Sequence, residues 1–386
     1  MYDLEQLRQT EFPLSNDYIY FNHASIAPIP ARARDKMRWS AERLAEQPTL
    51  HFQQDGLPLM EDFHNVIRRY INAASPQEVV PITATNVGLN MVAQALPWQA
   101  GDNVIFCDHE FPSNAYPWMS LERDGVEVRQ APAVGGGLTL AALEPLVDDQ
   151  TRVVAASAVQ FFSGHRTDLA TIGAFCRDRD IIFVVDAIQA AGHMLIDVQA
   201  MGIDVLAAGG QKSLMAPPGI GFLYVREALA ERLQPRFIAP NATRDWLFWL
   251  DYDLEPLPGA ERFMSGTPNV VGLFGLMQSI SLLSELGLEH IDQHTTLLAA
   301  EAIERLARLG YEPITPREEH GPIATFKTGL DAEQSDALVA HLAEQGASVV
   351  KHLSPSGEPH LRLSFHCYNN GEELDQFEAL MKDYRP

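Results

Sequence analysis

The stretch that decides the fold is residues 181–225, IIFVVDAIQAAGHMLIDVQAMGIDVLAAGGQKSLMAPPGIGFLYV. Its first apolar run ends in Asp186 and predicts a buried strand, and the residues from Ala187 onward predict a helix. A second apolar strand ends at Gly209, and a proline-rich turn leads into a third. Strands and helices that alternate in this way are typical of a parallel sheet with both faces covered.

Lys212 lies in a setting unlike that of the other lysines in the chain. It stands between two glycines and a Leu-Met-Ala-Pro-Pro run, where a hydrated ammonium group is hard to keep. The other four lysines lie in segments that read as solvated: Lys36, Lys327, Lys351 and Lys382. Because burial lowers the pKa of an amine, Lys212 is a candidate nucleophile. With Asp186 at a strand end upstream, this suggests a carbonyl cofactor on the lysine and its ring nitrogen on the aspartate.

Composition narrows the class of protein. The chain has 386 residues, enough for two or three domains, and its net charge of −23 argues against nucleic acid or an anionic membrane as a partner. Its three cysteines are widely spaced and form neither a disulfide framework nor a zinc set, which fits a cytoplasmic protein. The first residues lack the pattern of a signal peptide, and no apolar run is long enough to span a bilayer.

The flanking sequence predicts three regions. We expect an N-terminal arm over residues 1–30, a large α/β domain over 31–269 and a smaller α+β domain over 270–386. Further strands of the large domain are expected at EVVPIT (78–83), NVIFC (103–107), VEVRQ (126–130) and RVVAASAV (152–159). In the smaller domain, strands are expected at IATFK (323–327), ASVVK (347–351) and HLRLSF (360–365). Ligands of parallel sheets bind at the carboxyl ends of the strands. The polar turns expected to converge there are at Thr85, Phe111, Phe161, Asp186 and Lys212.

With these residues in view, the chain resembles the class V aminotransferase family of fold-type I pyridoxal-phosphate enzymes. That family includes cysteine desulfurases, kynureninases, isopenicillin N epimerase-like proteins and C–S lyases. The most specific motif is DAIQ…GGQKSLMAPPGIGFLYV, supported in the family's order by TATNVGLN, HEFPSNAYPW, RFMSGTPN and HLRLSFHCYNNGEEL. The resemblance implies a mainly parallel seven-stranded sheet flanked by helices, a small C-terminal α+β domain, pyridoxal phosphate as cofactor and a homodimer with shared active sites.

The resemblance also implies roles for individual residues. Lys212 matches the Schiff-base lysine, and Asp186 matches the carboxylate that pairs with the pyridinium nitrogen. Thr85 and Asn86 match the phosphate-binding turn, and Phe111 the aromatic that stacks on the cofactor ring. The complete set implied to bind the cofactor is Thr85, Asn86, Phe111, Asn114, Asp186, Gln189, Gly209, Gln211, Lys212 and Thr267.

Gln189 stands where the family places a donor to the ring hydroxyl, and Thr267 where a residue reaches the phosphate of the partner subunit. Arg362 matches the arginine that binds the substrate carboxylate. The other candidates for the substrate side are Asn22, His23, Phe161, His165 and Trp246.

Three departures from the family pattern concern the reaction. Gln211 stands where many members have a histidine. The stretch ASVVKHLSPSGEPH lacks the catalytic cysteine of desulfurases, and Cys367 comes after Arg362. Phe161 lies near the place of an asparagine in desulfurases. Persulfide chemistry is therefore not expected.

Simpler structural explanations remain open for these side chains. Asp186, Thr85 and Asn86 are residue types that cap helices, Phe111 could belong to a core, and Arg362 could form a structural ion pair. His290 and His294 have a spacing that can bind metal, but no third ligand is apparent. We therefore expect no metal.

The sequence predicts an enzyme that removes the α-proton of an amino acid, with Lys212 as general base and acid. Transamination is the first expectation, and a C–S or β-elimination lyase or an amino-acid epimerase is the alternative. A non-catalytic scaffold of the same fold is a further one. A nicotinamide cofactor is excluded because no G-x-G-x-x-G follows the first parallel strand.

Overall fold

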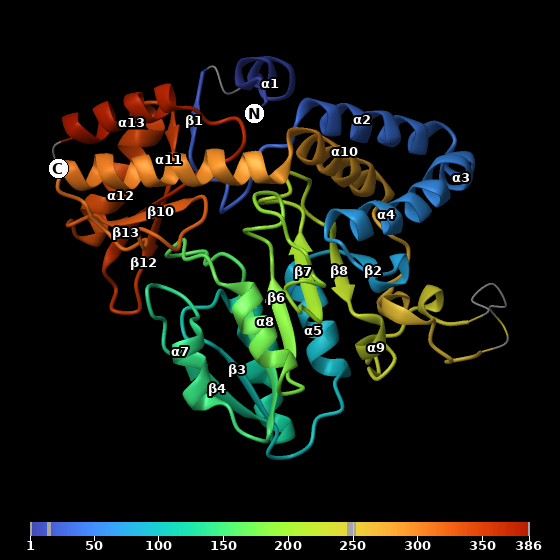
Figure 1. Cartoon of the computed structure of the whole chain (residues 1–386). Coiled ribbons are helices and arrows are strands. Elements are labelled where there is room, and N and C mark those ends of the chain that lie inside the picture. The colour runs from blue at the N-terminus through green and yellow to red at the C-terminus, as the bar shows by residue number, and fades with distance from the viewer. Residues whose placement is uncertain (1, 14–16, 245–249, 251, 385–386) are drawn as a thin grey trace.

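The computed structural model describes residues 2–13, 17–244, 250 and 252–384. Its centre is a seven-stranded sheet of order β2-β8-β7-β6-β5-β3-β4, shown in Figure 1. The strands are β2 (Val79–Ile82), β3 (Asn103–Cys107), β4 (Glu127–Ala131), β5 (Thr151–Ser157), β6 (Ile182–Asp186), β7 (Val205–Gly209) and β8 (Gly221–Val225). β8 runs antiparallel to both of its neighbours, and the remaining pairs are parallel. The predicted mainly parallel α/β fold is confirmed.

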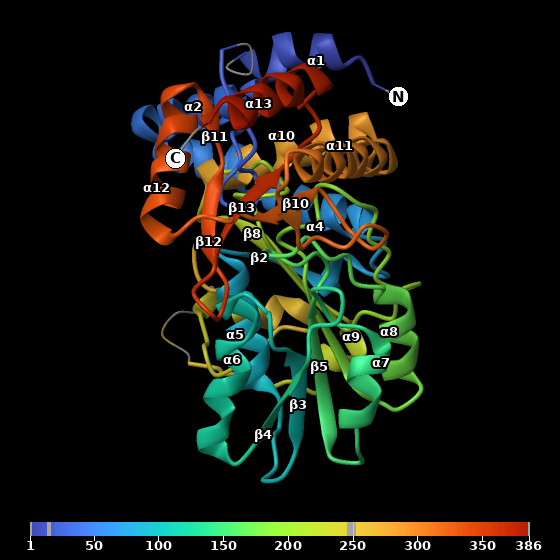
Figure 2. The same cartoon turned by 90° about the vertical axis from the view of Figure 1, so that its left-hand side faces the viewer.

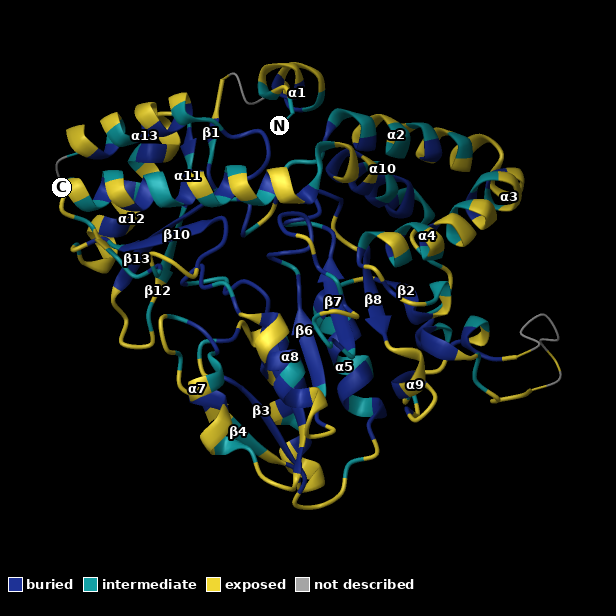
Figure 3. Cartoon of the chain, viewed as in Figure 1, coloured by how far each residue is buried: buried dark blue, intermediate teal, exposed yellow. Residues whose placement is uncertain are grey.

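Helices cover both faces of this sheet. Figure 2 shows α5 and α6 on one side of the strands and α7 and α8 on the other. Their bounds, with that of α9, are α5 (Thr85–Ala95), α6 (Tyr116–Met119), α7 (Leu140–Leu143), α8 (Leu169–Arg177) and α9 (Glu227–Ala230). Since side chains alternate along a strand, Phe183 and Val185 of β6 enter one apolar core, while Val184 enters the other. Figure 3 shows the strands other than the edge strand β4 as buried between helices with exposed outer faces.

A group of helices lies above one end of the sheet in Figure 1. These are α2 (Ala31–Glu46), α3 (Pro48–His51), α4 (Leu57–Tyr70) and α10 (Val270–Leu286), with a π-helical turn at Phe52–Gly56. After α10, α11 (Leu288–Arg308) runs over the C-terminal part of the chain (Figure 1). α2 ends at Glu46, and Pro48 begins the next helix. No single described helix is both long and apolar enough to cross a bilayer; α10 and α11 pass that test only together and are bent by 82°.

The C-terminal part forms a smaller sheet, and the start of the chain lies beside it. The antiparallel order is β12-β13-β10-β9, with α12 (Ala332–Glu344) and α13 (Gly371–Asp383) beside it. The strands are β9 (Glu312–Pro313), β10 (Ile323–Lys327), β12 (Val350–Leu353) and β13 (Pro359–Ser364). After α1 (Leu4–Glu11), β1 (Ile19–Tyr20) pairs in parallel with β11 (Ala347–Ser348). The N-terminal segment therefore runs beside the C-terminal sheet.

Two expected elements are wrong. Residues 188–193 form successive turns instead of the helix expected from Ala187. The cause is a close approach, since a Cβ at Gly192 would lie 1.7 Å from the carbonyl oxygen of Ser213. The strand expected at ASVVK is divided into β11 and β12, which belong to different sheets. In both cases a contact distant in sequence overrides a plausible local pattern.

Candidate active site

The polar turns at the strand ends meet in one place. Lys212 lies in the loop between β7 and β8, with its Nζ 5.1 Å from the centre of the Phe111 ring. The Phe111 ring meets the Phe161 ring edge-on at 5.0 Å. Thr85, the first residue of α5, accepts a hydrogen bond from the backbone N–H of Gly209 at 2.8 Å. These contacts join turns that follow four different strands.

Lys212 is partly buried beside one charge of each sign. Burial lowers the pKa of its amine to about 8; the negative charge of Asp186 acts in the opposite direction, and the positive charge of Arg362 adds to the lowering. About a tenth of the amine is therefore neutral at pH 7, far more than for an unperturbed lysine. This is the state that attacks a carbonyl group.

Asp186 ends β6 and is only 3% exposed. Burial raises the pKa of its carboxyl to about 6, against a hydrogen bond from the N–H of Ile188 to Oδ1 at 2.9 Å and the charge of Lys212. Of the residues that the structure describes, only Ile188 donates to this carboxyl, which leaves Oδ2 to accept from a ligand. Asp186 thus caps the turn that follows it, and its second oxygen fits a protonated ring nitrogen.

The N-terminus of α5 suits an anion. Its N-cap residue is Ala84, which has no side chain to accept from the first-turn N–H groups. Those groups and the helix dipole favour a phosphate at this point. The explanation of Thr85 and Asn86 as simple caps is wrong, since both lie inside the helix. Asn86 accepts instead from Nδ2 of Asn90 at 3.3 Å.

Phe111 is 38% exposed, so the explanation that it belongs to the core is wrong. Asn114, three residues on, is fully buried and accepts a hydrogen bond from the indole of Trp118 at 3.3 Å. Its Nδ2 has no partner within the described part of the chain. Phe111 therefore presents a ring face beside Lys212, while Asn114 lies beneath the loop.

Gln189 and Gln211 both contact the N-terminal segment. Nε2 of Gln189 donates to the carbonyl oxygen of Ala24 at 2.9 Å. The carbonyl oxygen of Gln211 accepts from the N–H of Ala27 at 2.8 Å. A Cβ at Gly209 would lie 2.8 Å from Oε1 of Gln211 and 3.2 Å from Oγ1 of Thr85, so the glycine leaves room for both side chains. The first thirty residues thus support the site from one side.

Arg362 on β13 is a buried cation without a carboxylate partner. It is 2% exposed and donates to the carbonyl oxygen of Phe161 at 2.7 Å and to Oγ of Ser25 at 2.8 Å. Its Nε has no partner, and no described carboxylate forms an ion pair with it. Burial lowers the pKa of the guanidinium to about 10. The explanation as a structural ion pair is wrong, and the group is suited to an anionic ligand.

The other residues expected on the substrate side are less open. The backbone of Asn22 forms an isolated parallel β-bridge with Ser364, and its Oδ1 is buried without a partner in the described chain. His23 is enclosed: its Nε2 lies 3.1 Å from Oδ1 of Asn369, and its ring contacts that of His366. His165 is 2% exposed. Trp246 lies outside the described residues.

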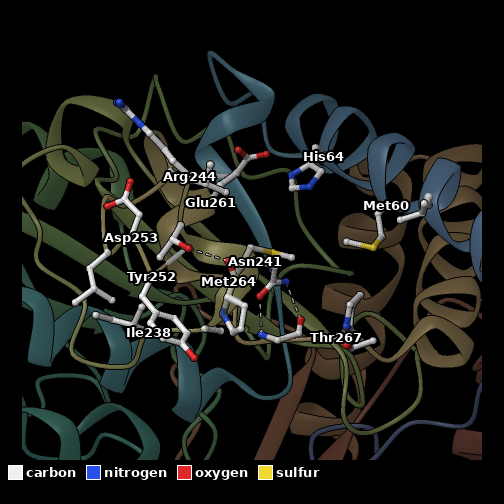
Figure 4. Close-up of a pocket in the computed structure, with 18 of the residues that line it drawn as sticks. Met60, His64, Ile238, Asn241, Arg244, Tyr252, Asp253, Glu261, Met264 and Thr267 are labelled. Atoms are coloured by element: carbon white, nitrogen blue, oxygen red, sulfur yellow. Dashed lines mark hydrogen bonds between the residues drawn. The ribbon is translucent and has the colours of Figure 1, made fainter. Parts of the chain in front are cut away.

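Thr267 lies in a separate pocket of about 860 Å³. Figure 4 shows the wall of this pocket, which is formed largely by residues from α4 and from the segment between α9 and α10. Met60, Ile238, Asn241 and Tyr252 stand around it with Thr267 (Figure 4). The structure records no contact between Thr267 and Lys212 within the described chain.

Sequence reasoning missed two residues beside the site. His352 on β12 contacts the ring of Phe161 edge-on, and burial with the charges of Arg362 and Lys212 lowers its pKa to about 4. Glu110 accepts hydrogen bonds from Ser157 at the end of β5. No local motif distinguishes either residue from an ordinary polar loop residue.

The comparisons with known proteins agree with this geometry. The family model described as aminotransferase class-V matches residues 19–377. A cysteine desulfurase of Salmonella choleraesuis is 35% identical over 343 residues, covering 83% of this chain and 81% of the relative. A probable cysteine desulfurase of Methanothermobacter thermautotrophicus is 28% identical over 383 residues, 94% of each chain.

Among solved structures, the apo cysteine desulfurase of Thermococcus onnurineus has a TM-score of 0.88 at 27% identity, covering 99% of this chain and 98% of that one. The cystine C–S lyase C-DES, at 22% identity and a TM-score of 0.85, shares the fold and covers 97% of this chain. The chain belongs to the class V aminotransferase family of pyridoxal phosphate-dependent enzymes.

Proposed function

We propose that the protein is an aminotransferase that acts on an α-amino acid, with Lys212 as the covalent anchor of pyridoxal phosphate and as the proton carrier. The observation that carries this proposal is a partly buried amine with a lowered pKa that lies 5.1 Å from the centre of the Phe111 ring and is influenced by the charge of Asp186. The N-terminus of α5 fits the phosphate, and Asp186 fits the ring nitrogen. When bound, the cofactor withdraws electrons from the substrate's α-carbon.

The residues of the chain divide the remaining work. Arg362 binds the substrate carboxylate through a planar, permanently charged group that no described carboxylate neutralises. Lys212, once released by the substrate amine, takes the α-proton as its neutral amine and returns it as an ammonium group. Phe111 covers one side of the site and limits the access of water to this amine.

Transamination is supported by the shortage of other proton-transfer groups. His352 has a pKa of about 4 and is neutral at pH 7, and the guanidinium of Arg362 does not exchange protons there. Asp186 and Glu110 have raised pKa values, but Asp186 is assigned to the ring nitrogen and three donors hold Glu110. Lys212 is then the side chain left to move the α-proton. Amino transfer would need one base to move a proton between two carbons, which Lys212 can do, and a water molecule to release the keto acid.

A C–S lyase is the second candidate, supported by the names of the relatives. A thiolate leaves a carbon without help from a general acid, so the same groups suffice. Persulfide formation on a protein cysteine is not proposed. The loop between β12 and β13 has no cysteine, and the three thiols of the chain are buried with raised pKa values.

We also propose a homodimer with shared sites. The segment that lines the pocket of Thr267 exposes apolar side chains to an extent that favours a protein partner. They are Phe237 (57% exposed), Ile238 (51%), Tyr252 (88%) and Leu254 (71%). A second copy placed here would bring Thr267 towards its neighbour's phosphate site. Three free, buried cysteines fit a cytoplasmic location, which we propose as well.

The test of the function is spectroscopic and kinetic. Purified wild type and Lys212→Ala are compared after addition of pyridoxal phosphate, and wild type is then given amino acids with and without a keto-acid acceptor. We expect visible absorption of the lysine-bound cofactor in wild type alone, and turnover that depends on the acceptor. Release of pyruvate and sulfide without acceptor would select the lyase. Equal spectra for both proteins would overturn the role of Lys212.

A further inference from the structure

Glu110 is a buried carboxyl that the proposed reaction does not use. It follows β3, directly precedes Phe111 and is 9% exposed. Its Oε1 accepts from the backbone N–H of Ser157 at 2.8 Å and from Nε2 of Gln160 at 3.0 Å. Its Oε2 accepts from the hydroxyl of Ser157 at 2.5 Å. Three donors fix both oxygens, so this side chain has one defined position.

Each of these donors is attached to a part of the site. Ser157 is the last residue of β5 and pairs with Asp186 across the sheet. Gln160 directly precedes Phe161, whose carbonyl oxygen accepts from Arg362 at 2.7 Å. Glu110 therefore connects the strand that ends beside Asp186 with the turn that holds Arg362.

The backbone of Glu110 makes the third connection. The next residue is Phe111, whose ring lies 5.0 Å from that of Phe161 and 5.1 Å from Nζ of Lys212. The loop after β3 and the loop after β5 are thus held together twice, once by the carboxyl of Glu110 and once by the two rings. The ring of Phe111 would be free to tilt if only its contact with Phe161 held it. The hydrogen bonds of Glu110 fix the preceding residue and so restrict this tilt.

The cost of this arrangement favours a role beyond stability. Burial raises the pKa of Glu110 to about 7, hydrogen bonds from Ser157 lower it, and the charge of Asp186 raises it further. Placing a second carboxyl near Asp186 is electrostatically unfavourable, and a neutral side chain would fill the space more stably. Perturbed carboxyls of this kind are concentrated at functional sites.

We propose that Glu110 is a positioning residue that holds the Phe111 ring and the Arg362 guanidinium in one fixed relation to Lys212. The inference rests on the proposed function, because it assumes that Phe111 meets the cofactor and Arg362 the substrate carboxylate. Glu110 itself touches neither. Its effect is on the distance between the bound carboxylate and the amine that moves the proton.

The experiment compares Glu110→Ala and Glu110→Gln with a matched control. Glu78 is a similarly buried carboxyl (3% exposed) that also accepts three N–H groups, from Ala74, Ser75 and Glu227. Glu78→Ala therefore reports what a purely structural carboxyl does. Four quantities are measured: the affinity of the apoprotein for pyridoxal phosphate, the absorption maximum of the loaded protein, KM and kcat for an amino acid, and Tm.

We expect Glu110→Ala to raise KM about tenfold to a hundredfold, to shift the absorption maximum and to weaken cofactor binding. Glu110→Gln keeps the shape of the side chain and can still accept from Ser157, so its KM should lie close to that of wild type. Glu78→Ala should lower Tm and leave KM and the spectrum unchanged. If Glu110→Ala does not fold, Gln160→Ala tests the link to Arg362 alone and should raise KM by a smaller factor.

The proposal is overturned if Glu110→Ala behaves as Glu78→Ala does, with a lower Tm and unchanged KM and spectrum. For a non-folding Glu110→Ala, an unchanged KM in Gln160→Ala overturns it. A wild-type protein that binds no pyridoxal phosphate would instead refute the proposed function, so the two failures are distinguishable.

Discussion

Arg362 is the residue whose environment departs most from what stability alone would select. A buried guanidinium that donates only to neutral oxygens retains a charge that no described carboxylate offsets. Arg8 offers the contrast, because it is equally buried (6% exposed) but lies 3.2 Å from Glu373. One arginine is thus neutralised by the fold, and the other is left for a ligand.

This contrast gives a prediction. Arg362→Met should raise KM for an amino acid roughly 10- to 150-fold, since a charge-assisted hydrogen bond contributes about 1.5–3 kcal/mol. Arg8→Met should leave KM unchanged and lower the free energy of unfolding by about 3–5 kcal/mol, because it leaves Glu373 buried and unpaired. Steady-state kinetics and urea unfolding measure the two effects. A KM for Arg362→Met equal to wild type would mean that the carboxylate binds elsewhere.

His366 carries a pH dependence of stability. Its Nε2 lies 2.8 Å from the carbonyl oxygen of Ser213, and its Nδ1 accepts from the N–H of Cys367 at 2.8 Å. A proton on Nδ1 would oppose that second donor. Burial lowers the pKa of His366 to about 4, from about 6.5 in the unfolded chain. Between these values the unfolded chain binds the proton and the folded chain does not.

The unfolding free energy of the apoprotein should therefore fall as the pH falls from 6.5 towards 4, by up to about 1.4 kcal/mol per pH unit for this histidine. Asp186 and Glu110 act in the opposite direction, because their raised pKa values let the folded chain hold protons there. Both remain in His366→Asn, so the difference between that variant and wild type isolates the histidine. The free energy of unfolding is measured with urea at pH 7.5 and 5.0. If it changes by the same amount in wild type and in His366→Asn, the prediction is contradicted.

At the scale of the elements, the backbone of the turn after β6 packs directly against the backbone of the loop after β7. A side chain at Gly192 would overlap the backbone of Ser213, next to Lys212. Gly192→Ala should cost at least about 1–3 kcal/mol of stability and weaken cofactor binding, because Ser213 must move. Gly371→Ala, at the first residue of α13 with no atom within 4 Å of the new Cβ, is the control. Thermal unfolding and titration with pyridoxal phosphate should distinguish Gly192→Ala from Gly371→Ala. Similar results for the two variants would refute the prediction.

The elements also show how far the sequence predicts this molecule. The strand expected at 103–107 is β3, because five consecutive buried apolar or backbone-paired positions need no distant information. The helix expected after Asp186 is absent because Gly192 meets Ser213, which no local pattern encodes. Asp186 and Lys212 could be predicted because they lie in one local motif. The role of Glu110 could not, because its contacts are distant in sequence. Its partner Ser157 lies 47 residues away.

For the whole molecule, the proposed dimer predicts a mass in solution near twice the 42.8 kDa of the chain. Leu254→Glu should shift it towards the monomer and weaken pyridoxal phosphate binding, because a charge on an apolar interface is costly and Thr267 no longer reaches the neighbouring site. Leu297→Glu, at an exposed position of α11 (59%), is the control. Sedimentation that is monomeric for wild type would refute the dimer.

The place of the N-terminal segment in the fold determines when the site can be completed during synthesis on the ribosome. Ala24 donates to Ser364, 340 residues later, and Ser25 contacts Arg362. At about 5–20 residues per second, a ribosome needs roughly 17–70 s to make that intervening chain. Throughout this interval Ala24 and Ser25 have been made, but their partners on β13, Ser364 and Arg362, have not. The substrate side of the site is therefore completed only after the last strand leaves the ribosome, so a nascent chain stalled before β13 can hold no substrate at Arg362.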